Sequence, residues 1–276
     1  MLKTLVSAGT GGLVGVGAYA YAYERHAVRV VHASLPVSGL APEHAGLRIG
    51  LLTDLHHSEF TSQADIAAAV ELAMAQRPDL VVLGGDYVSF REREYMEPCA
   101  EALTRLTAPH GVFAILGNHD DDRDMPSALE RRGFTVLMDQ RTTRMIRGAP
   151  LDLAGVQFWT NAPGDIARVL GAAARTSILI AHDPRRLVQA AQLAVPAVLS
   201  GHTHGGQVVL PVLGAPAARR FPVIAGTGSS GATSIFVSRG IGTVYLPIRV
   251  NCPPEVAMIT LHAPAPHSPD GPARVR

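Results

Sequence analysis

Several short segments of this chain carry aspartate, asparagine or histidine at positions where a run of apolar residues ends. They are Asp54-Leu55-His56, Gly84-Gly85-Asp86, Gly117-Asn118-His119-Asp120, His182-Asp183 and Gly201-His202-Thr203-His204. Imidazole nitrogens combined with carboxylate and amide oxygens suit Mn, Fe, Zn or Co, and such a set is too rich in nitrogen for a dedicated Ca or Mg site. The pattern therefore predicts a site for divalent metal ions.

Each of these segments follows a stretch that we expect to be a buried strand, at residues 47–53, 79–83, 111–116, 177–181 and 197–199. Ligands of open α/β sheets bind beyond the carboxyl ends of the strands, so the segments are expected to converge. Any one of them alone is a weak signal, because a Gly-Asp pair is usually a turn and a single histidine is often a hydrogen-bonded core residue. The His202-Thr203-His204 pair is stronger, because alternate residues of an extended segment point the same way.

The remaining chain alternates helical and strand patterns. Helices are expected at residues 61–77, 95–107, 125–132 and 184–193, and later strands at 207–213, 234–237, 243–246 and 256–261. Strand–helix alternation followed by a β-rich C-terminal half predicts an α/β fold built as a layered sandwich. We expect this domain to span residues 26–262, with a disordered Pro-rich tail at 263–276.

Residues 4–23 contain no charged side chain, and a helix of that length just spans a bilayer. Tyr19, Tyr21 and Tyr23 cluster at its end, as in an interfacial aromatic belt. Residues 1–25 are therefore expected to anchor the protein in a membrane. Two alternatives are a signal segment that is cleaved on export, with a small-residue site near Ala20, and a buried glycine-rich segment.

Composition sets wider limits. With 276 residues, of which 47% are apolar, the chain can form one domain of ordinary size with a short appendage. A net charge of +1, without a basic stripe interleaved with aromatic residues, argues against a nucleic-acid partner. Cys99 and Cys252 permit a disulfide but do not require one, which leaves the redox compartment open. No protein partner is evident.

The order of the metal-binding residue types is that of a known signature. Asp54-x-His56, Gly85-Asp86, Gly117-Asn118-His119-Asp120, His182 and Gly201-His202-x-His204 resemble the calcineurin-like metallophosphoesterase superfamily over about residues 47–261, with every motif position occupied. The N-terminus and the Ser238-Arg239-Gly240 segment resemble its membrane-associated bacterial phosphodiesterase branch. The resemblance implies an α/β/β/α sandwich at a bacterial cytoplasmic membrane.

The resemblance also implies roles for single residues. One ion would be held by Asp54, His56, Asp86 and His204. The other would be held by Asp86, Asn118, His182 and His202, with Asp86 as the bridge. His119 would face the substrate as a catalytic acid, and Asp120 would orient its imidazole. Two cations can neutralise the charge of phosphate ester hydrolysis and hold a bridging hydroxide for attack, while a histidine protonates the leaving oxygen.

We therefore expect a phosphoesterase with a dinuclear metal centre, acting on phosphodiesters. An alternative is a lipid-head-group pyrophosphohydrolase of the UDP-diacylglucosamine type, because an anchored enzyme suits a lipid-linked substrate. A more remote alternative is a non-catalytic metal-binding protein, which the complete ligand set disfavours. His57 is left out of the site because its side chain would point away from that of His56. Arg249 and Asn251 are interpreted as structural pairing rather than as substrate contacts.

Overall fold

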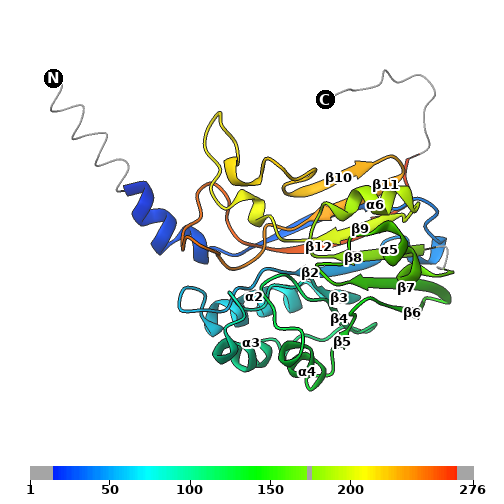
Figure 1. The fold of residues 1–276 in the computed structure, drawn as a ribbon, viewed down its shortest axis with the longest axis horizontal. Helices are drawn as coiled ribbons and strands as arrows, with labels where there is room; N and C mark the ends of the chain where they lie inside the picture. The colour runs from blue at the N-terminus through cyan, green and yellow to red at the C-terminus, as the bar shows by residue number, and fades with distance from the viewer. Residues whose placement is uncertain (1–14, 173–175, 266–276) are drawn as a thin grey trace.

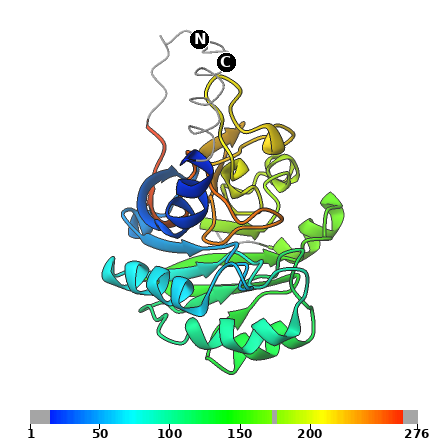
Figure 2. The same ribbon diagram turned by 90° about the vertical axis from the view of Figure 1, so that its left-hand side faces the viewer.

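The computed structural model describes residues 15–172 and 176–265, which form two facing β-sheets flanked by helices (Figure 1). Each sheet has six strands. Helices cover the outer face of each sheet, so the order of layers is helix, sheet, sheet, helix (Figures 1 and 2). The α/β/β/α sandwich expected from the sequence is confirmed.

The first sheet is mainly parallel. Its strands, in spatial order, are β1 (Arg29–Pro36), β12 (Glu255–His262), β2 (Arg48–Leu52), β3 (Leu80–Leu83), β4 (Val112–Ala114) and β5 (Thr135–Val136). The pairs from β2 to β5 are parallel, while β12 runs antiparallel to β2. β3 and β4 are buried along their whole length and uniformly apolar, as is typical of parallel strands covered on both faces.

The second sheet has a parallel centre and antiparallel edges. Its strands, in order, are β10 (Gly226–Ser230), β11 (Thr233–Val237), β9 (Ala197–Ser200), β8 (Thr176–Ala181), β7 (Ala149–Val156) and β6 (Gln140–Ile146). β7, β8, β9 and β11 pair in parallel, and the hairpins β6–β7 and β10–β11 close the two edges.

Helices α2 (Gln63–Ala75), α3 (Met96–Ala102) and α4 (Asp124–Glu130) lie against the first sheet, and α5 (Pro163–Leu170) and α6 (Arg186–Gln192) against the second (Figure 1). Short 3₁₀ turns occur at η1 (Glu24–His26), η2 (Pro42–His44), η3 (Arg93–Tyr95), η4 (His204–Gly206) and η5 (Pro216–Ala218). α2 begins in a capping box, in which Ser62 and Asp65 satisfy each other's backbone N–H groups. Pro78 follows its end and cannot extend it.

Three apolar clusters hold the four layers together. One joins α2, α3 and α4 to the first sheet, for example Ile66 against Leu83. A second lies between the two sheets and includes Phe113 and Phe236. The third joins α5 and α6 to the second sheet. Alternate residues of a strand point to opposite faces, so β2 gives Ile49 and Leu51 to the inter-sheet core and Leu52 to the helix-facing one.

Several elements differ from the sequence-based expectation. Residues 207–213 and 243–246 are not strands, although isolated bridges such as that of Val208 with Val250 occur there. The helix expected at residues 95–107 ends at Ala102. The strands β1, β5, β6, β7 and β10 and the helix α5 were not anticipated from the sequence.

The prediction of a membrane location was wrong. Within residues 15–172 and 176–265, no helix is long and apolar enough to cross a bilayer. Residues 4–14 of the expected anchor, and most of the expected tail at 263–276, lie outside the described residues.

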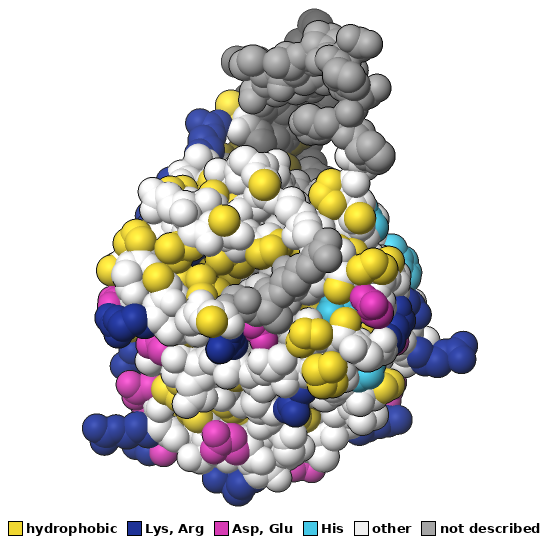
Figure 3. Space-filling view, turned by 90° about the vertical axis from the view of Figure 1, so that its right-hand side faces the viewer, with side chains coloured by type: hydrophobic (Ala, Val, Ile, Leu, Met, Phe, Trp, Pro, Cys, Tyr) yellow, Lys and Arg dark blue, Asp and Glu magenta, His cyan; other side chains and the backbone are white. Residues whose placement is uncertain are grey.

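Charged groups of both signs are interspersed over the lower part of the face shown in Figure 3. The free cysteines Cys99 and Cys252 are both buried. Cys99 lies in the cluster beneath the first sheet, and the Cys252 thiol contacts the carbonyl oxygen of His204 at 3.2 Å. Each is therefore an ordinary packed residue.

Candidate metal centre

The segments singled out in the sequence meet at the carboxyl ends of β2, β3 and β4 in the first sheet and of β8 and β9 in the second. Their acidic and histidine side chains form two groups, in each of which the possible ligand atoms lie within 4.8 Å of one another. The first group is Asp54, His56 and His204, and the second is Asp86, His182 and His202. Each group draws on both sheets, so the centre forms only when the sandwich closes.

Asp86 lies between the two groups. Its Oδ2 is 3.4 Å from His56 Nε2 in one group and 3.1 Å from His182 Nε2 in the other. Its Oδ1 accepts the backbone N–H of His119 at 2.8 Å. One carboxylate oxygen is thus fixed by the backbone, while the other faces both groups of histidines.

The orientation of the histidine rings leaves nitrogens available inside the centre. His182 Nδ1 donates to the carbonyl oxygen of Gly84 at 2.7 Å, which fixes the tautomer and leaves Nε2 as the free nitrogen. His56 Nδ1 contacts Ser89 Oγ at 3.2 Å. His204 Nε2 lies 3.1 Å from His56 Nε2 and 3.3 Å from Asp54 Oδ1. The inward-facing nitrogens therefore lie beside carboxylate oxygens.

The donor set fits divalent cations. Among the described residues, the buried atoms Asn118 Oδ1 and His182 Nε2 make no hydrogen bond. Buried polar atoms without a hydrogen-bond partner are rare, and each calls for an explanation such as an ion. Both atoms belong to residues expected to hold the second ion, and the mixture of imidazole, carboxylate and amide ligands matches a transition metal.

The buried carboxylates of the metal centre favour positive charge beside them. Although burial acts against it, the charges of Asp86 and Asp54 raise the pKa of His182 to about 10. Burial would raise the pKa of Asp86, but His182 and His56 hold it well below the usual value. Burial and the charge of His182 lower the pKa of His202 to about 3. The buried carboxylates of Asp54 and Asp86 thus favour positive charge between them, either on His182 or on a bound cation.

The backbone of the centre is unusual. Asp54, His56, Asp86, His202 and His204 all lie in the left-handed region, with φ values of 51°, 46°, 55°, 71° and 51°. Such conformations cost energy in residues other than glycine and cluster at functional sites. The sequence argument that His202 and His204 lie on an extended segment was therefore wrong. The tight turn sends His202 to one group and His204 to the other.

Two glycines allow the carboxylates to approach the backbone. A Cβ on Gly117 would overlap the carboxylate of Asp86, and one on Gly201 would overlap that of Asp54. Asp54 accepts the backbone N–H of His202 at 3.0 Å, and the hydroxyl of Thr53 donates to it at 2.8 Å. A side chain at either glycine would displace a ligand.

His119 borders the centre and is nearly buried. Its Nδ1 accepts the backbone N–H of Phe90 at 3.1 Å, so the proton of the neutral ring is assigned to Nε2. The rings of Phe90 and Tyr245 lie 5.0 and 6.3 Å from it, centroid to centroid. Phe90 and Tyr245 were not singled out in the sequence, where nothing distinguishes them from core aromatic residues.

Asp120 does not orient His119 in the way expected from the sequence. Its Oδ1 accepts the N–H of Tyr87 at 2.7 Å, and its Oδ2 accepts those of Asp86 and Gly117 at 2.8 Å each. Burial and the charge of Asp86 raise the pKa of Asp120 to about 7. The carboxylate thus holds together the backbone turns that carry Asp86 and Asn118.

Three residues that were set aside in the sequence have structural contacts. His57 donates from Nδ1 to the carbonyl oxygen of Tyr95 at 2.9 Å. The fully buried guanidinium of Arg249 donates to the carbonyl oxygens of Cys252, Arg239 and Gly242 at 3.1, 2.8 and 2.6 Å. Asn251 donates to the carbonyl oxygen of Val209 at 3.1 Å. Arg249 therefore holds together the loops behind His204.

Comparison with known proteins supports the sequence signature. The model of the calcineurin-like phosphoesterase family matches residues 47–206. Phosphodiesterase YaeI of Escherichia coli is 32% identical over 232 residues, which cover 79% of this chain and 83% of that protein. The metallophosphoesterase YkuE of Bacillus subtilis is 28% identical over 263 residues, 91% of this chain and 92% of that protein.

Solved structures are more distant. The NAD nucleotidase NadN of Haemophilus influenzae aligns with a TM-score of 0.49 and 14% identity, covering 71% of this chain and 45% of that one. The sulfate thiohydrolase SoxB of Thermus thermophilus gives a TM-score of 0.49 and 10% identity, covering 73% of this chain and 53% of that one. These likenesses are too slight to carry an argument about this chain.

Proposed function

Because this chain belongs to the calcineurin-like phosphoesterase family and is a metal-dependent phosphoester hydrolase, we propose that it hydrolyses phosphodiesters at a centre of two divalent metal ions. One ion is assigned to Asp54, His56 and His204, and the other to Asn118, His182 and His202, with Asp86 shared. The observation that carries this proposal is the position of Asp86 Oδ2 between His56 and His182. The relative from E. coli that is named a phosphodiesterase supports the choice of diesters.

When bound, two such ions would supply positive charge to the phosphoryl oxygens and lower the pKa of an attacking water. The protein's own contribution is to place ligands rigidly. Asp86 Oδ1 is tied to the backbone of His119, and His182 is tied to Gly84, so neither side chain needs to reorganise during a reaction. Preorganised charge of this kind is usually the largest catalytic term.

His119 is assigned to the leaving oxygen of the substrate. Since Nδ1 accepts the N–H of Phe90, it cannot hold a proton without losing that hydrogen bond. Burial also lowers the pKa of His119. We infer that His119 acts as a neutral donor from Nε2, forming a hydrogen bond to the leaving oxygen. This role differs from the full proton transfer expected from the sequence.

The alternatives drawn from the sequence are weaker. The lipid-head-group pyrophosphohydrolase rested on the expected N-terminal anchor, and the described residues contain no helix long and apolar enough to cross a bilayer. The non-catalytic reading requires a lost ligand or a lost catalytic histidine, whereas both ligand groups and His119 are in place.

The bridge assignment is tested by metal analysis of single variants. Asp86→Asn keeps the acceptor for the His119 N–H but removes the shared charge, so both ions should be depleted. His56→Ala should mainly empty one site. Asp122→Asn removes an exposed carboxylate from the same region and should retain both ions. Hydrolysis of bis(4-nitrophenyl) phosphate is measured in parallel. Retention of one full equivalent by Asp86→Asn would contradict the bridge, and a fully loaded protein inert toward diesters would contradict the proposed function.

A further inference from the structure

Two loops beside the metal centre expose apolar side chains. Residues 207–213 and 243–246, whose composition predicts strands, are irregular here, and Leu210, Tyr245 and Leu246 are exposed. Strand-like segments normally bury such side chains in a core. Exposed apolar groups that gather in one place commonly mark a binding surface. These loops are therefore candidates for a contact with substrate.

A cavity of about 590 Å³ is bounded by these loops and by the metal centre. Its polar end includes Asp86, Asn118, His119, His202 and His204. Its apolar walls include Val208, Leu210, Phe221, Tyr245, Leu246 and Ile248. The size is that of a small-molecule site, and apolar walls with a few convergent polar groups are the usual composition of one.

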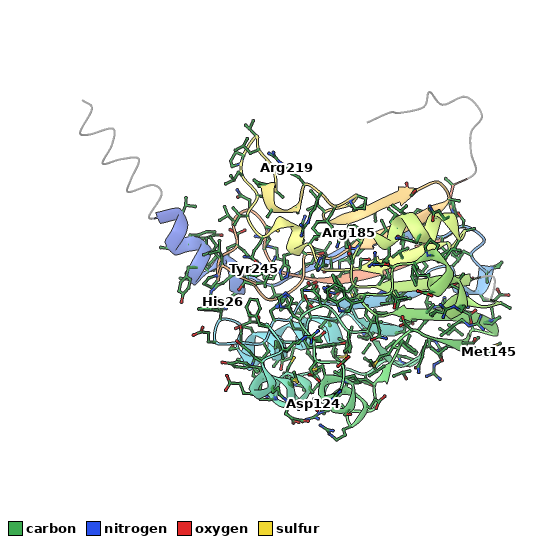
Figure 4. The ribbon with its side chains drawn as sticks, in the orientation of Figure 1. His26, Asp124, Met145, Arg185, Arg219 and Tyr245 are labelled. Carbon is green, nitrogen blue, oxygen red and sulfur yellow. The ribbon has the colours of Figure 1, made fainter. Side chains whose placement is uncertain are left out.

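Aromatic rings join the apolar walls to the polar end. The ring of Phe221 lies 5.4 Å from that of His202, edge to face, and the ring of Tyr245 lies 6.3 Å from that of His119. The apolar surface thus begins directly beside the histidines. In Figure 4, Tyr245 lies below the projecting loop that carries Arg219. A group attached to a phosphate at the centre would meet this surface first.

The wall carrying Tyr245 and Leu246 is fixed to the centre through Gln207. The amide nitrogen of Gln207 donates to the carbonyl oxygen of Leu246 at 2.7 Å, and its amide oxygen accepts the N–H of Val244 at 3.0 Å. Gln207 directly follows the η4 turn that begins at His204. The cavity is therefore preformed, and binding does not require its wall to be ordered first.

One cation belongs to the lining. The guanidinium of Arg220 lies 5.3 Å from the centroid of the Phe221 ring, at the apolar wall. We propose that this cavity is a subsite for an apolar substituent of the substrate, so that the enzyme prefers amphiphilic phosphodiesters. The phosphate would lie at the metal centre, and the apolar substituent along the wall formed by Phe221, Tyr245 and Leu246. The inference rests on the proposed function and names the substrate class of that same site.

The test varies only the apolar group. Alkyl 4-nitrophenyl phosphates with methyl, butyl and octyl chains share one leaving group, so differences in kcat/KM report on the chain. Burying a methylene is worth about 0.8 kcal/mol, or about fourfold. In a cavity that is open on one side, kcat/KM should rise roughly tenfold or more from methyl to butyl.

Leu246→Asn and Leu210→Asn each make one wall polar, and both should bring the butyl-to-methyl ratio toward one. Met145→Gln is the matched control, because Met145 is an apolar residue of β6 that is 65% exposed and does not line the cavity. It should keep the wild-type ratio. Metal content and melting temperature are measured for each variant, and the second wall variant replaces the first if one does not fold.

A butyl-to-methyl ratio of kcat/KM near one in the wild type would contradict the proposed subsite. A ratio that stays at the wild-type value in both wall variants would also contradict it. An unchanged ratio combined with a shift from dimer to monomer in sedimentation would assign the surface to a second copy of the chain. If no ester is hydrolysed, the proposed function fails separately. Isothermal titration calorimetry then tests the subsite through binding affinity alone. Octyl phosphate should bind the metal-loaded wild type more tightly than methyl phosphate does. Equal affinities would overturn the inference.

Discussion

Replacing Asp120 with alanine should destabilise the fold around the metal centre. The carboxylate accepts the buried N–H groups of Tyr87, Asp86 and Gly117 at 2.7–2.8 Å, and alanine leaves these donors without that acceptor. An unsatisfied buried donor costs about 1–3 kcal/mol. The lower end applies here, because the raised pKa of Asp120, about 7, means that its ionised form is itself held at a cost. Three donors give an expected loss of about 3 kcal/mol.

A loss of that size is a large part of the about 5–15 kcal/mol that stabilises a typical protein. It is measured by urea unfolding followed by far-UV circular dichroism, in the presence of EDTA so that metal binding does not contribute. Asp122→Ala is the matched control. Asp122 lies two residues after Asp120, and its exposed side chain carries the same charge. Its free energy of unfolding should stay within about 0.5 kcal/mol of wild type.

The same variant separates two roles for Asp120. Support of the backbone predicts that stability and metal affinity fall together, because Asp120 fixes the turn that carries Asp86. Orientation of the His119 ring, as expected from the sequence, predicts slow turnover in a protein of normal stability with both ions bound. The second result would refute the reasoning from these hydrogen bonds.

Two further predictions concern the role of His119 at the leaving oxygen and the stability of helix α2. His119→Ala should retain both ions and slow an alkyl diester more than a nitrophenyl diester by much less than about 10²-fold, because a neutral hydrogen-bond donor stabilises the leaving oxygen without transferring its proton. A defect larger by about 10²-fold or more for the alkyl ester in a leaving-group series would instead identify a general acid. Ser62→Ala should lower the free energy of unfolding by about 1 kcal/mol, because it removes the capping box of α2. An unchanged thermal transition would mean that tertiary packing alone holds the start of this helix.

Much of the fold was predictable because its strands are local apolar runs. The segments that became β3, β8 and β9 are buried along their whole length, and β2 is buried after Arg48, as their apolar composition indicates. The helix α2 was visible from its alanine content and from Pro78 after its end. Strand β6 was not visible, because it lies at the edge of a sheet and most of its residues are polar and exposed. Its pairing with β7 determines its structure.

Apolar composition led to wrong strand predictions where apolar side chains line a cavity and are not packed in a core. Residues 207–213 and 243–246 have the composition of strands, yet Leu210 and Leu246 are exposed at the cavity beside the metal centre. Periodicity reports that a side chain is apolar. Periodicity does not report whether other parts of the fold will bury that side chain.

The sequence by itself determined the chemistry of this protein. The types and order of Asp54, His56, Asp86, Asn118, His182, His202 and His204 name the family and the donor set, because ligand chemistry belongs to the residues themselves. The family resemblance already implied how they divide into two groups, and only the tertiary structure decided how they are held. His202 and His204 separate into two groups because both adopt left-handed backbone conformations. His119 takes its tautomer from Phe90, and Asp120 supports the backbone, because these hydrogen bonds join the loops after β3 and β4, which come together only when the two strands pair in the first sheet.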